Sequence, residues 1–199
     1  MTEFSSSQTK TNLMKAFAGE SMARNRYTYA ASQAGKQNLY VIEAVFRFTA
    51  DQEKEHGEIF YNHLKDLVGE KITIKADYPV APSDTAVQLL RAAQQAEFEE
   101  YDEIYQFFGD VASKEGFMAV AESFYKIAEI EKTHGERFSK FADLLEQGKL
   151  FVSDIECKWM CLNCGHVESA VSAPVSCPVC HHNQGYFVRL ELAPWTGKN

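Results

Sequence analysis

Cysteine is missing from most of the chain. The first 156 of the 199 residues contain none, and all five cysteines lie between Cys157 and Cys180. Disulfide-stabilised proteins distribute their cysteines through the fold that the bonds hold together, whereas metal sites gather them in one segment. The distribution therefore argues against a disulfide scaffold. It predicts a metal site in a reducing compartment, and we expect a cytoplasmic protein.

Long apolar runs, basic patches and nucleotide motifs are also lacking. No stretch approaches the ~18 apolar residues of a membrane-spanning helix, and residues 1–10 are polar, without the apolar core of a secretory signal. The net charge is −8, and no basic stripe is present to neutralise phosphates. No glycine-rich motif for a nicotinamide cofactor occurs. We therefore expect neither a membrane nor a nucleic acid as partner, and any reductant must be another protein.

Helix breakers are rare from about Thr9 to Gln147, so this region is predicted to be helical almost throughout. Interruptions at 35–38, 69–83 and 109–116 divide it into four long amphipathic segments. The first and third joints are short, which predicts two antiparallel helix pairs. The second joint is longer and contains prolines, which suits a crossover connection in a four-helix bundle.

The character of the chain changes after Gly148, where short β-type stretches, turn residues and cysteines follow. We therefore expect two domains, a helical bundle over 1–148 and a small domain over 149–199. Ser83 and Asp84 are predicted to cap the third helix.

Each predicted helix carries a glutamate in the middle of its apolar stripe. Glu20 lies 33 residues before Glu53, and Glu97 lies 34 residues before Glu131. The second and fourth helices repeat one motif, in which a histidine follows the glutamate by three residues, giving the pairs Glu53/His56 and Glu131/His134. This weak repeat predicts that the four motifs lie at one level of the bundle. In the third helix the apolar stripe is Leu90, Ala93, Glu97, Glu100 or Tyr101, Ile104 and Phe108.

Four carboxylates in one apolar core would repel one another, and each would lose several kcal/mol of hydration. A solvent-exposed helix face explains most of the 28 acidic residues, but not four that interrupt apolar stripes. A pair of metal ions supplies the missing positive charge, and Glu-x-x-His can place two ligands on one ion. Iron or manganese suits such a site better than zinc or copper, although ligand type alone leaves the others open.

Glu100 follows Glu97 by three residues and offers a fifth carboxylate. Two ferrous ions balance four carboxylates, and their oxidation to ferric ions adds two charges. We therefore hypothesise that one iron exchanges neutral His56 for anionic Glu100 on oxidation. Tyr27 and Tyr105 lie on or beside the inward face, where they could donate hydrogen bonds to the ligands or to a bound peroxide, or could simply pack in the core.

The C-terminal cysteines form two Cys-x-x-Cys turns separated by twelve residues, Cys161/Cys164 and Cys177/Cys180. Such turns direct four thiolates at one ion, which can be zinc or iron. Spacing alone favours structural zinc, but a redox di-iron centre needs an electron source, and that favours a single iron. Cys157 is predicted to be a free thiol. The aromatic residues expected to form the core of this small domain are Trp159, Tyr186, Phe187 and Trp195.

Together these motifs, in this order, resemble the rubrerythrin family, in which a ferritin-like di-iron bundle precedes a rubredoxin-like domain. The resemblance extends from about residue 10 to about residue 190. It implies that Glu53 and Glu131 bridge the two irons. It places Glu20 with His56 or Glu100 on one iron, and Glu97 with His134 on the other.

The resemblance also implies an activity: reduction of hydrogen peroxide in oxidative-stress defence. Electrons would come from NAD(P)H through separate carriers of the rubredoxin or rubredoxin-reductase type. It further implies homodimers in which the tetracysteine iron of one subunit serves the di-iron site of the other. Two alternatives stay open: a ferroxidase that handles iron for storage, and a non-redox protein with zinc in its C-terminal domain.

Overall fold

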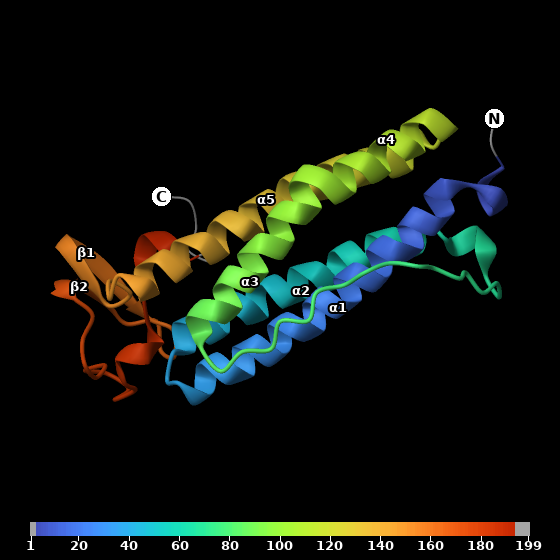
Figure 1. Cartoon of the computed structure of the whole chain (residues 1–199). Helices are drawn as coiled ribbons and strands as arrows, with labels where there is room; N and C mark the ends of the chain where they lie inside the picture. Colours follow the sequence, from blue (N-terminus) through green and yellow to red (C-terminus); the bar gives the residue numbers. More distant parts are fainter. Residues whose placement is uncertain (1–2, 194–199) are drawn as a thin grey trace.

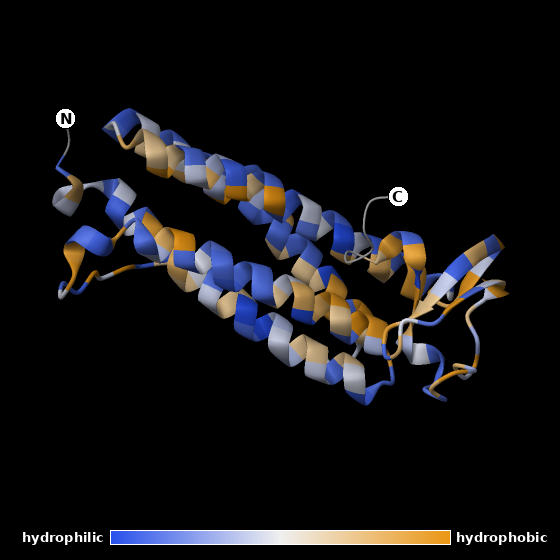
Figure 2. Ribbon diagram, turned by 180° about the vertical axis from the view of Figure 1, so that it is seen from behind, coloured by the Kyte–Doolittle hydropathy of each residue, from blue (hydrophilic) through white to orange (hydrophobic). Residues whose placement is uncertain are grey.

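The computed structural model describes residues 3–193, and the helices form an elongated bundle with a small sheet at one end (Figure 1). The bundle consists of α1 (Gln8–Lys36), α2 (Tyr40–Asn62), α3 (Ala86–Glu99), α4 (Tyr105–Glu115) and α5 (Met118–Glu146). Short 3-10 turns, η1 (Phe4–Ser6) and η2 (Lys65–Leu67), precede α1 and follow α2. Hydrophilic and hydrophobic residues are mixed along each helix, as amphipathic packing requires (Figure 2).

The helices pair as predicted. α1 packs along α2, and α5 packs along both α3 and α4. Residues 68–85, between η2 and α3, have no regular structure and cross the length of the bundle beside α1 (Figure 1). We call them the crossover segment. No described helix combines the length and the apolarity needed to cross a membrane.

Two predicted helix ends are wrong. Thr85 caps α3 by accepting a hydrogen bond from the Gln88 N–H, whereas Ser83 lies two residues before the cap and accepts from the Thr85 N–H. The predicted break at 109–116 shrinks to a turn at Gly116, which adopts a left-handed φ of 93°. Gly109 lies inside α4, and a side chain there would collide with the ring of Tyr125.

A π-helical segment, η3 (Glu100–Ile104), separates α3 from α4 and was not predicted. Here the Tyr105 N–H donates to the Glu100 carbonyl, five residues earlier. The extra residue in this turn shifts the inward face by one position. Ile104, expected in the core, is therefore 37% exposed, and Tyr105 takes the inward position at 1% exposure.

The C-terminal segment forms a three-stranded sheet in the order β2-β1-β3, from β1 (Val152–Cys161), β2 (Val167–Ser172) and β3 (Phe187–Arg189). Both pairings are antiparallel. The small C-terminal region has a hydrophobic core of its own, in which Trp159 and Phe187 are buried and against which Tyr186 is partly buried. Trp195, also expected in this core, lies outside the described residues. The predicted β-type region is thus confirmed.

The sheet is fixed to one end of the bundle. Tyr186 stacks on Tyr40 at the start of α2, with ring centroids 4.0 Å apart, and Val188 belongs to the same hydrophobic core as α2 and α5. A side chain at Gly185 would collide with the Asn38 carbonyl, so the two parts approach backbone to backbone there. The division into domains 1–148 and 149–199 stays our proposal, which the turn at Gly148 (φ 66°) after α5 supports.

Candidate metal centres

The bundle brings together the six glutamates and histidines of the sequence repeat. They come from α1, α2, α3 and α5, and all six are buried. Their side-chain atoms form two groups in which all ligand atoms lie within 4.8 Å of one another. The groups are Glu20, Glu53, His56 and Glu131, and Glu53, Glu97, Glu131 and His134. Glu53 and Glu131 therefore belong to both groups, the position that bridging ligands require.

Each histidine uses its Nδ1 atom in the same way. His56 Nδ1 lies 3.0 Å from Glu53 Oε2 and 2.9 Å from Glu131 Oε1. His134 Nδ1 lies 2.9 Å from Glu53 Oε1 and 2.9 Å from Glu131 Oε2. The two shared carboxylates thus offer one oxygen to each side, and the repeat in sequence becomes an approximate two-fold symmetry in space.

Whether the six residues could hold two metal ions can be tested from the hydrogen bonds of their side-chain oxygen and nitrogen atoms. Buried polar atoms normally have hydrogen-bond partners. Among the described residues, six buried atoms of this cluster have none with acceptable geometry: Glu20 Oε2, Glu53 Oε1, Glu97 Oε2, both Glu131 oxygens and His134 Nδ1. Their lone pairs converge instead on common points, so the donor set fits two cations that would satisfy them.

The charges of the cluster are strongly perturbed. Burial raises the pKa of Glu20 and Glu97 well above the ordinary value for a glutamate. Burial alone would lower the pKa of both histidines, but the adjoining glutamates raise it to about 9 for His56 and about 12 for His134. Burial would likewise raise the pKa of Glu53, but both histidines together lower it to about 2. Without a metal, protons therefore supply the positive charge that the carboxylates need.

Glu100 belongs to neither group of ligand atoms. It is half-buried in the wall of a cavity of about 420 Å³, close enough to Glu97, Glu131 and Glu53 for their charges to add to the effect of burial in raising its pKa. Its place at the start of η3 puts it beside the cluster without filling a ligand position. The hypothesis that Glu100 replaces His56 on oxidation thus starts from a structure in which His56 faces the cluster.

Two tyrosines hold the unshared glutamates. The Tyr27 hydroxyl donates a short hydrogen bond to Glu97 Oε1, and the Tyr105 hydroxyl donates to Glu20 Oε1 at 2.6 Å. Their rings also pack in the core, Tyr27 between Phe46 and Phe138 and Tyr105 beside Phe60. The two roles considered from the sequence, packing and hydrogen bonding, therefore apply together. The ring of each tyrosine fills the core, and its hydroxyl orients a carboxylate.

Sequence reasoning missed Gln52 and Arg137. Arg137 Nη1 donates to Gln52 Oε1 at 3.0 Å, and His134 Nε2 lies 3.1 Å from the same oxygen. Because arginine can only donate, the amide oxygen must face it, and His134 Nε2 must then be the donor. That tautomer leaves Nδ1 free for a metal. The position of Gln52 just before Glu53, and of Arg137 three residues after His134, is the only sequence signal for this pair.

His56 has no comparable support. Within the described residues its hydrogen-bond and ion-pair contacts involve Nδ1, and none fixes its other ring nitrogen. A hydrogen bond thus fixes the ring nitrogen of His134 that faces away from the cluster, and no such bond fixes that of His56. This asymmetry favours His56 over His134 as the ligand that can leave.

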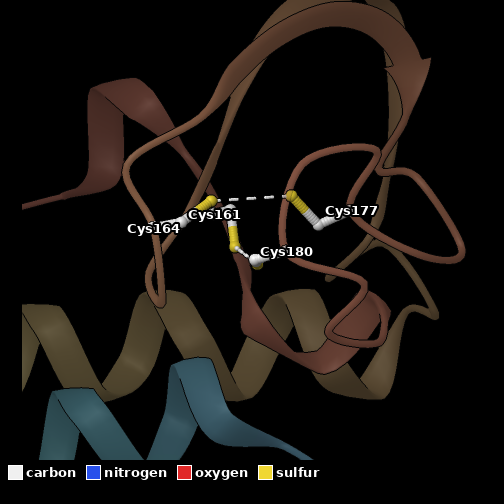
Figure 3. Close-up of side chains that lie close together, drawn as sticks. All are labelled: Cys161, Cys164, Cys177 and Cys180. Carbon is white, nitrogen blue, oxygen red and sulfur yellow. Dashed lines mark hydrogen bonds between the residues drawn. The ribbon is translucent and has the colours of Figure 1, made fainter.

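The four paired cysteines converge in the small domain, with their sulfur atoms turned toward one another (Figure 3). Cys161 Sγ lies 3.7 Å from Cys180 Sγ, and Cys164 Sγ lies 3.6 Å from Cys177 Sγ. These separations are far too long for a disulfide bond, at about 2.0 Å. They match the roughly 3.8 Å between sulfurs of a tetrahedral site with metal–sulfur bonds of about 2.3 Å. Cys157 lies outside this group, as predicted.

The two cysteine turns are built alike. Cys161 N–H donates to the His166 carbonyl and Cys177 N–H to the His182 carbonyl, each at 2.8 Å. The residue after each second cysteine, Gly165 or His181, adopts a left-handed φ. This geometry turns backbone N–H groups toward the sulfurs, and the His182 N–H lowers the pKa of the Cys180 thiol to about 5. At Cys180 the turn thus favours a thiolate, the form that binds metal, whereas burial raises the pKa of the Cys161 thiol to about 12.

Comparisons with known proteins agree with this geometry. The rubrerythrin family model matches residues 11–142, and the model of the rubrerythrin rubredoxin-like domain matches residues 159–188. A rubrerythrin of Clostridium perfringens is 46% identical, covering 94% of this chain and 96% of its own length. A rubrerythrin of Nitratidesulfovibrio vulgaris is 38% identical, covering 96% and 99%.

Solved structures agree on the fold. The fully reduced, all-ferrous state of nigerythrin superposes with a TM-score of 0.62 at 24% identity, covering 94% of this chain and 91% of that one. The predicted fold class, a ferritin-like four-helix bundle with a small rubredoxin-like domain, is confirmed.

Removing the support behind His134 should weaken metal binding. In Gln52→Leu the His134 ring loses its acceptor, and we expect ferrous affinity to fall about 10- to 100-fold, the usual effect of such partners. Anaerobic competition with a chromogenic chelator measures it. Gln95→Leu is the matched control, because Gln95 is exposed on α3 and its amide donates to Glu99. Equal affinities in the two variants would contradict this role.

Metal binding should release protons. At pH 7 both histidines of the metal-free cluster are protonated, because their pKa values are raised to about 9 and about 12. Ligation by Nδ1 requires the neutral ring, so binding at pH 7 should release at least two protons, and the apparent affinity should rise with pH. Calorimetry of ferrous binding in buffers of different ionisation enthalpy counts them. A count of zero contradicts the charge assignment.

Proposed function

The chain belongs to the rubrerythrin family, and on that premise we propose that it reduces hydrogen peroxide to water with electrons delivered through its tetracysteine site. Membership makes it an iron oxidoreductase with a carboxylate- and histidine-lined di-iron site and a four-cysteine rubredoxin-like site. The observation that carries the proposal is the pair of ligand groups sharing Glu53 and Glu131, in the same chain as a four-thiolate site. A two-electron site and a one-electron site together suit a reductase.

The proposed ligands follow the two groups. Glu20 and His56 would hold one iron, Glu97 and His134 the other, and Glu53 and Glu131 both. When bound, the ferrous pair supplies one electron from each ion, the two that H2O2 needs to become two H2O with two protons. Glu100 lies in the cavity wall, and we propose that it replaces His56 when oxidation raises the charge of the metal pair.

The residues around the ligands keep the site rigid and dry. Tyr27 and Tyr105 fix the unshared glutamates, and Gln52 with Arg137 fixes His134. Phe46 and Phe138 close the core on one side and Phe60 and Phe124 on the other, all fully buried. Excluding water strengthens the electrostatic interactions at the centre, and the cavity at Glu100 offers peroxide a way toward it.

Electrons are proposed to enter at the exposed edge of the tetracysteine site. Cys164 is exposed and Cys180 half-buried, whereas Cys161 and Cys177 are buried. Because no nicotinamide motif is present, the donor is proposed to be an external protein of the rubredoxin or rubredoxin-reductase type. The clustered cysteines support a cytoplasmic setting, where thiolates stay reduced.

The internal route between the two centres is long. The small domain contacts the start of α2 at Tyr40, and Glu53 lies 13 residues further along that helix. At about 1.5 Å per residue this separation is about 20 Å along the helix axis. Such a distance supports a homodimer in which the tetracysteine iron of one subunit serves the di-iron site of the other.

The proposal predicts a fast reaction of reduced protein with peroxide. Anaerobic stopped-flow mixing of reduced, iron-loaded protein with stoichiometric H2O2 should produce the ferric tetrathiolate absorption much faster than mixing with O2. Glu100→Ala should slow it by about 10- to 100-fold with iron content retained, because the fifth carboxylate is lost. Glu103→Ala, an exposed position on the same π turn, should react like the wild type.

Other outcomes point to the alternatives. Colour that appears only with O2, together with mineral formation under excess Fe(II), would favour a ferroxidase. Colour that never appears, with zinc in the cysteine site, would favour a non-redox protein. Peroxide kinetics unchanged by Glu100→Ala would contradict the exchange of His56 for Glu100.

A further inference from the structure

A cavity opens beside the bundle centre, between α1, the crossover segment and the helix that runs from α3 into α4. Its volume is about 420 Å³, and its wall includes Glu100 and Tyr105. Tyr105 is 1% exposed, and its hydroxyl donates to Glu20 in the metal cluster. The cavity therefore ends on a residue that touches a ligand and on Glu100, the carboxylate that stands beside the cluster.

The cavity is larger than hydrogen peroxide needs. A water molecule has a share of about 30 Å³ in the liquid, and H2O2 adds one oxygen atom to it. Sites for small organic molecules begin at about 300 Å³. A cavity of about 420 Å³ thus falls in the size class of an organic ligand.

The lining selects the chemistry of such a ligand. Much of the wall is apolar, formed by Ala16, Ala76, Pro79, Ala96, Ile104 and Phe108. The formal charges of the lining balance, because it contains three basic residues, Lys15, Arg26 and Lys75, and three acidic residues, Asp77, Glu99 and Glu100. An apolar wall with no net charge suits an uncharged molecule that has one apolar end.

The crossover segment closes the outer side of the cavity. The Tyr78 hydroxyl donates to the Lys15 carbonyl at 3.0 Å and fastens the segment to α1. The Tyr78 ring also lies beside Gly19 on α1, where a Cβ atom would be in ordinary contact with it at 3.7 Å. Ala76, two residues before Tyr78 on the same segment, belongs to the wall of the cavity.

We propose that this cavity is the substrate entrance and that it admits small uncharged alkyl hydroperoxides as well as H2O2. The alkyl group lies against the apolar wall, and the O–O group reaches Glu100 and Tyr105. The O–O bond breaks and ROOH with two electrons and two protons gives ROH and water. A ferrous pair held by the ligand groups would supply the two electrons, one from each ion, and solvent would supply the two protons. The inference rests on the proposed peroxide reductase function.

The test uses a substitution that narrows the cavity and changes none of the metal-ligand residues. Ala76→Trp and Ala81→Trp each place a large ring at an exposed position of the same segment, and of the two residues only Ala76 lines the cavity. We expect Ala76→Trp to lower kcat/KM for tert-butyl hydroperoxide about 10-fold or more, in the range of steric discrimination by apolar pockets. The value for H2O2 should change less than about 3-fold, and Ala81→Trp should leave both unchanged.

Binding of the product supplies a second readout that needs no turnover. Saturation-transfer NMR of tert-butyl alcohol with the iron-loaded protein should show binding to the wild type and to Ala81→Trp, and its loss in Ala76→Trp. Wild-type protein that reduces H2O2 but neither reduces tert-butyl hydroperoxide nor binds the alcohol would overturn the inference. Equal losses in the two tryptophan variants would overturn it too.

Failure with H2O2 is a separate outcome. If the wild type reduces neither peroxide, the proposed function itself is contradicted. The alcohol measurement then still decides whether the cavity binds an organic molecule: binding lost only in Ala76→Trp supports the site, and absence of binding in the wild type rejects it.

Discussion

The charge balance of four buried glutamates is the constraint on which the rest of the structure depends. Glu20, Glu53, Glu97 and Glu131 are fully buried at mid-bundle, where unpaired carboxylates would each cost several kcal/mol. Only concentrated positive charge makes this core stable, either protons on the histidines or a pair of metal ions. The helices, their pairing and the tyrosine hydrogen bonds all serve to bring these oxygens to common points.

The cluster departs from two-fold symmetry at the residues that we propose to take part in the reaction. His134 is held from behind by Gln52 and Arg137, whereas no described residue fixes the far ring nitrogen of His56. The π turn η3 places Glu100 beside the cluster, close to Glu97, Glu131 and Glu53, and in the wall of a cavity. A symmetric site would bind two equivalent ions, whereas here only the His134 side has a fixed far ring nitrogen among the described residues, and we propose that the His56 side is the one that changes ligand and meets substrate.

Much of this could be predicted from the sequence, because periodicity and motif spacing report on the backbone. The Glu-x-x-His repeat located the ligand groups, and the Cys-x-x-Cys pairs located the thiolate site. The π turn could not be predicted, since no residue pattern marks the extra residue that moves Tyr105 inward and Ile104 outward. Gln52, Arg137 and the cavity at Ala76 were equally out of reach, because they depend on contacts between residues 85 positions apart or between α1 and the crossover segment.

The most direct test of the account is to locate the metal ions themselves. Anomalous diffraction from crystals of iron-loaded protein, recorded on both sides of the iron absorption edge, shows where iron binds. The account predicts two iron peaks in the bundle, one within each ligand group and both against Glu53 and Glu131, and a third among the four cysteines. A single peak in the bundle, or none, would contradict the claim that a metal pair balances the buried carboxylates.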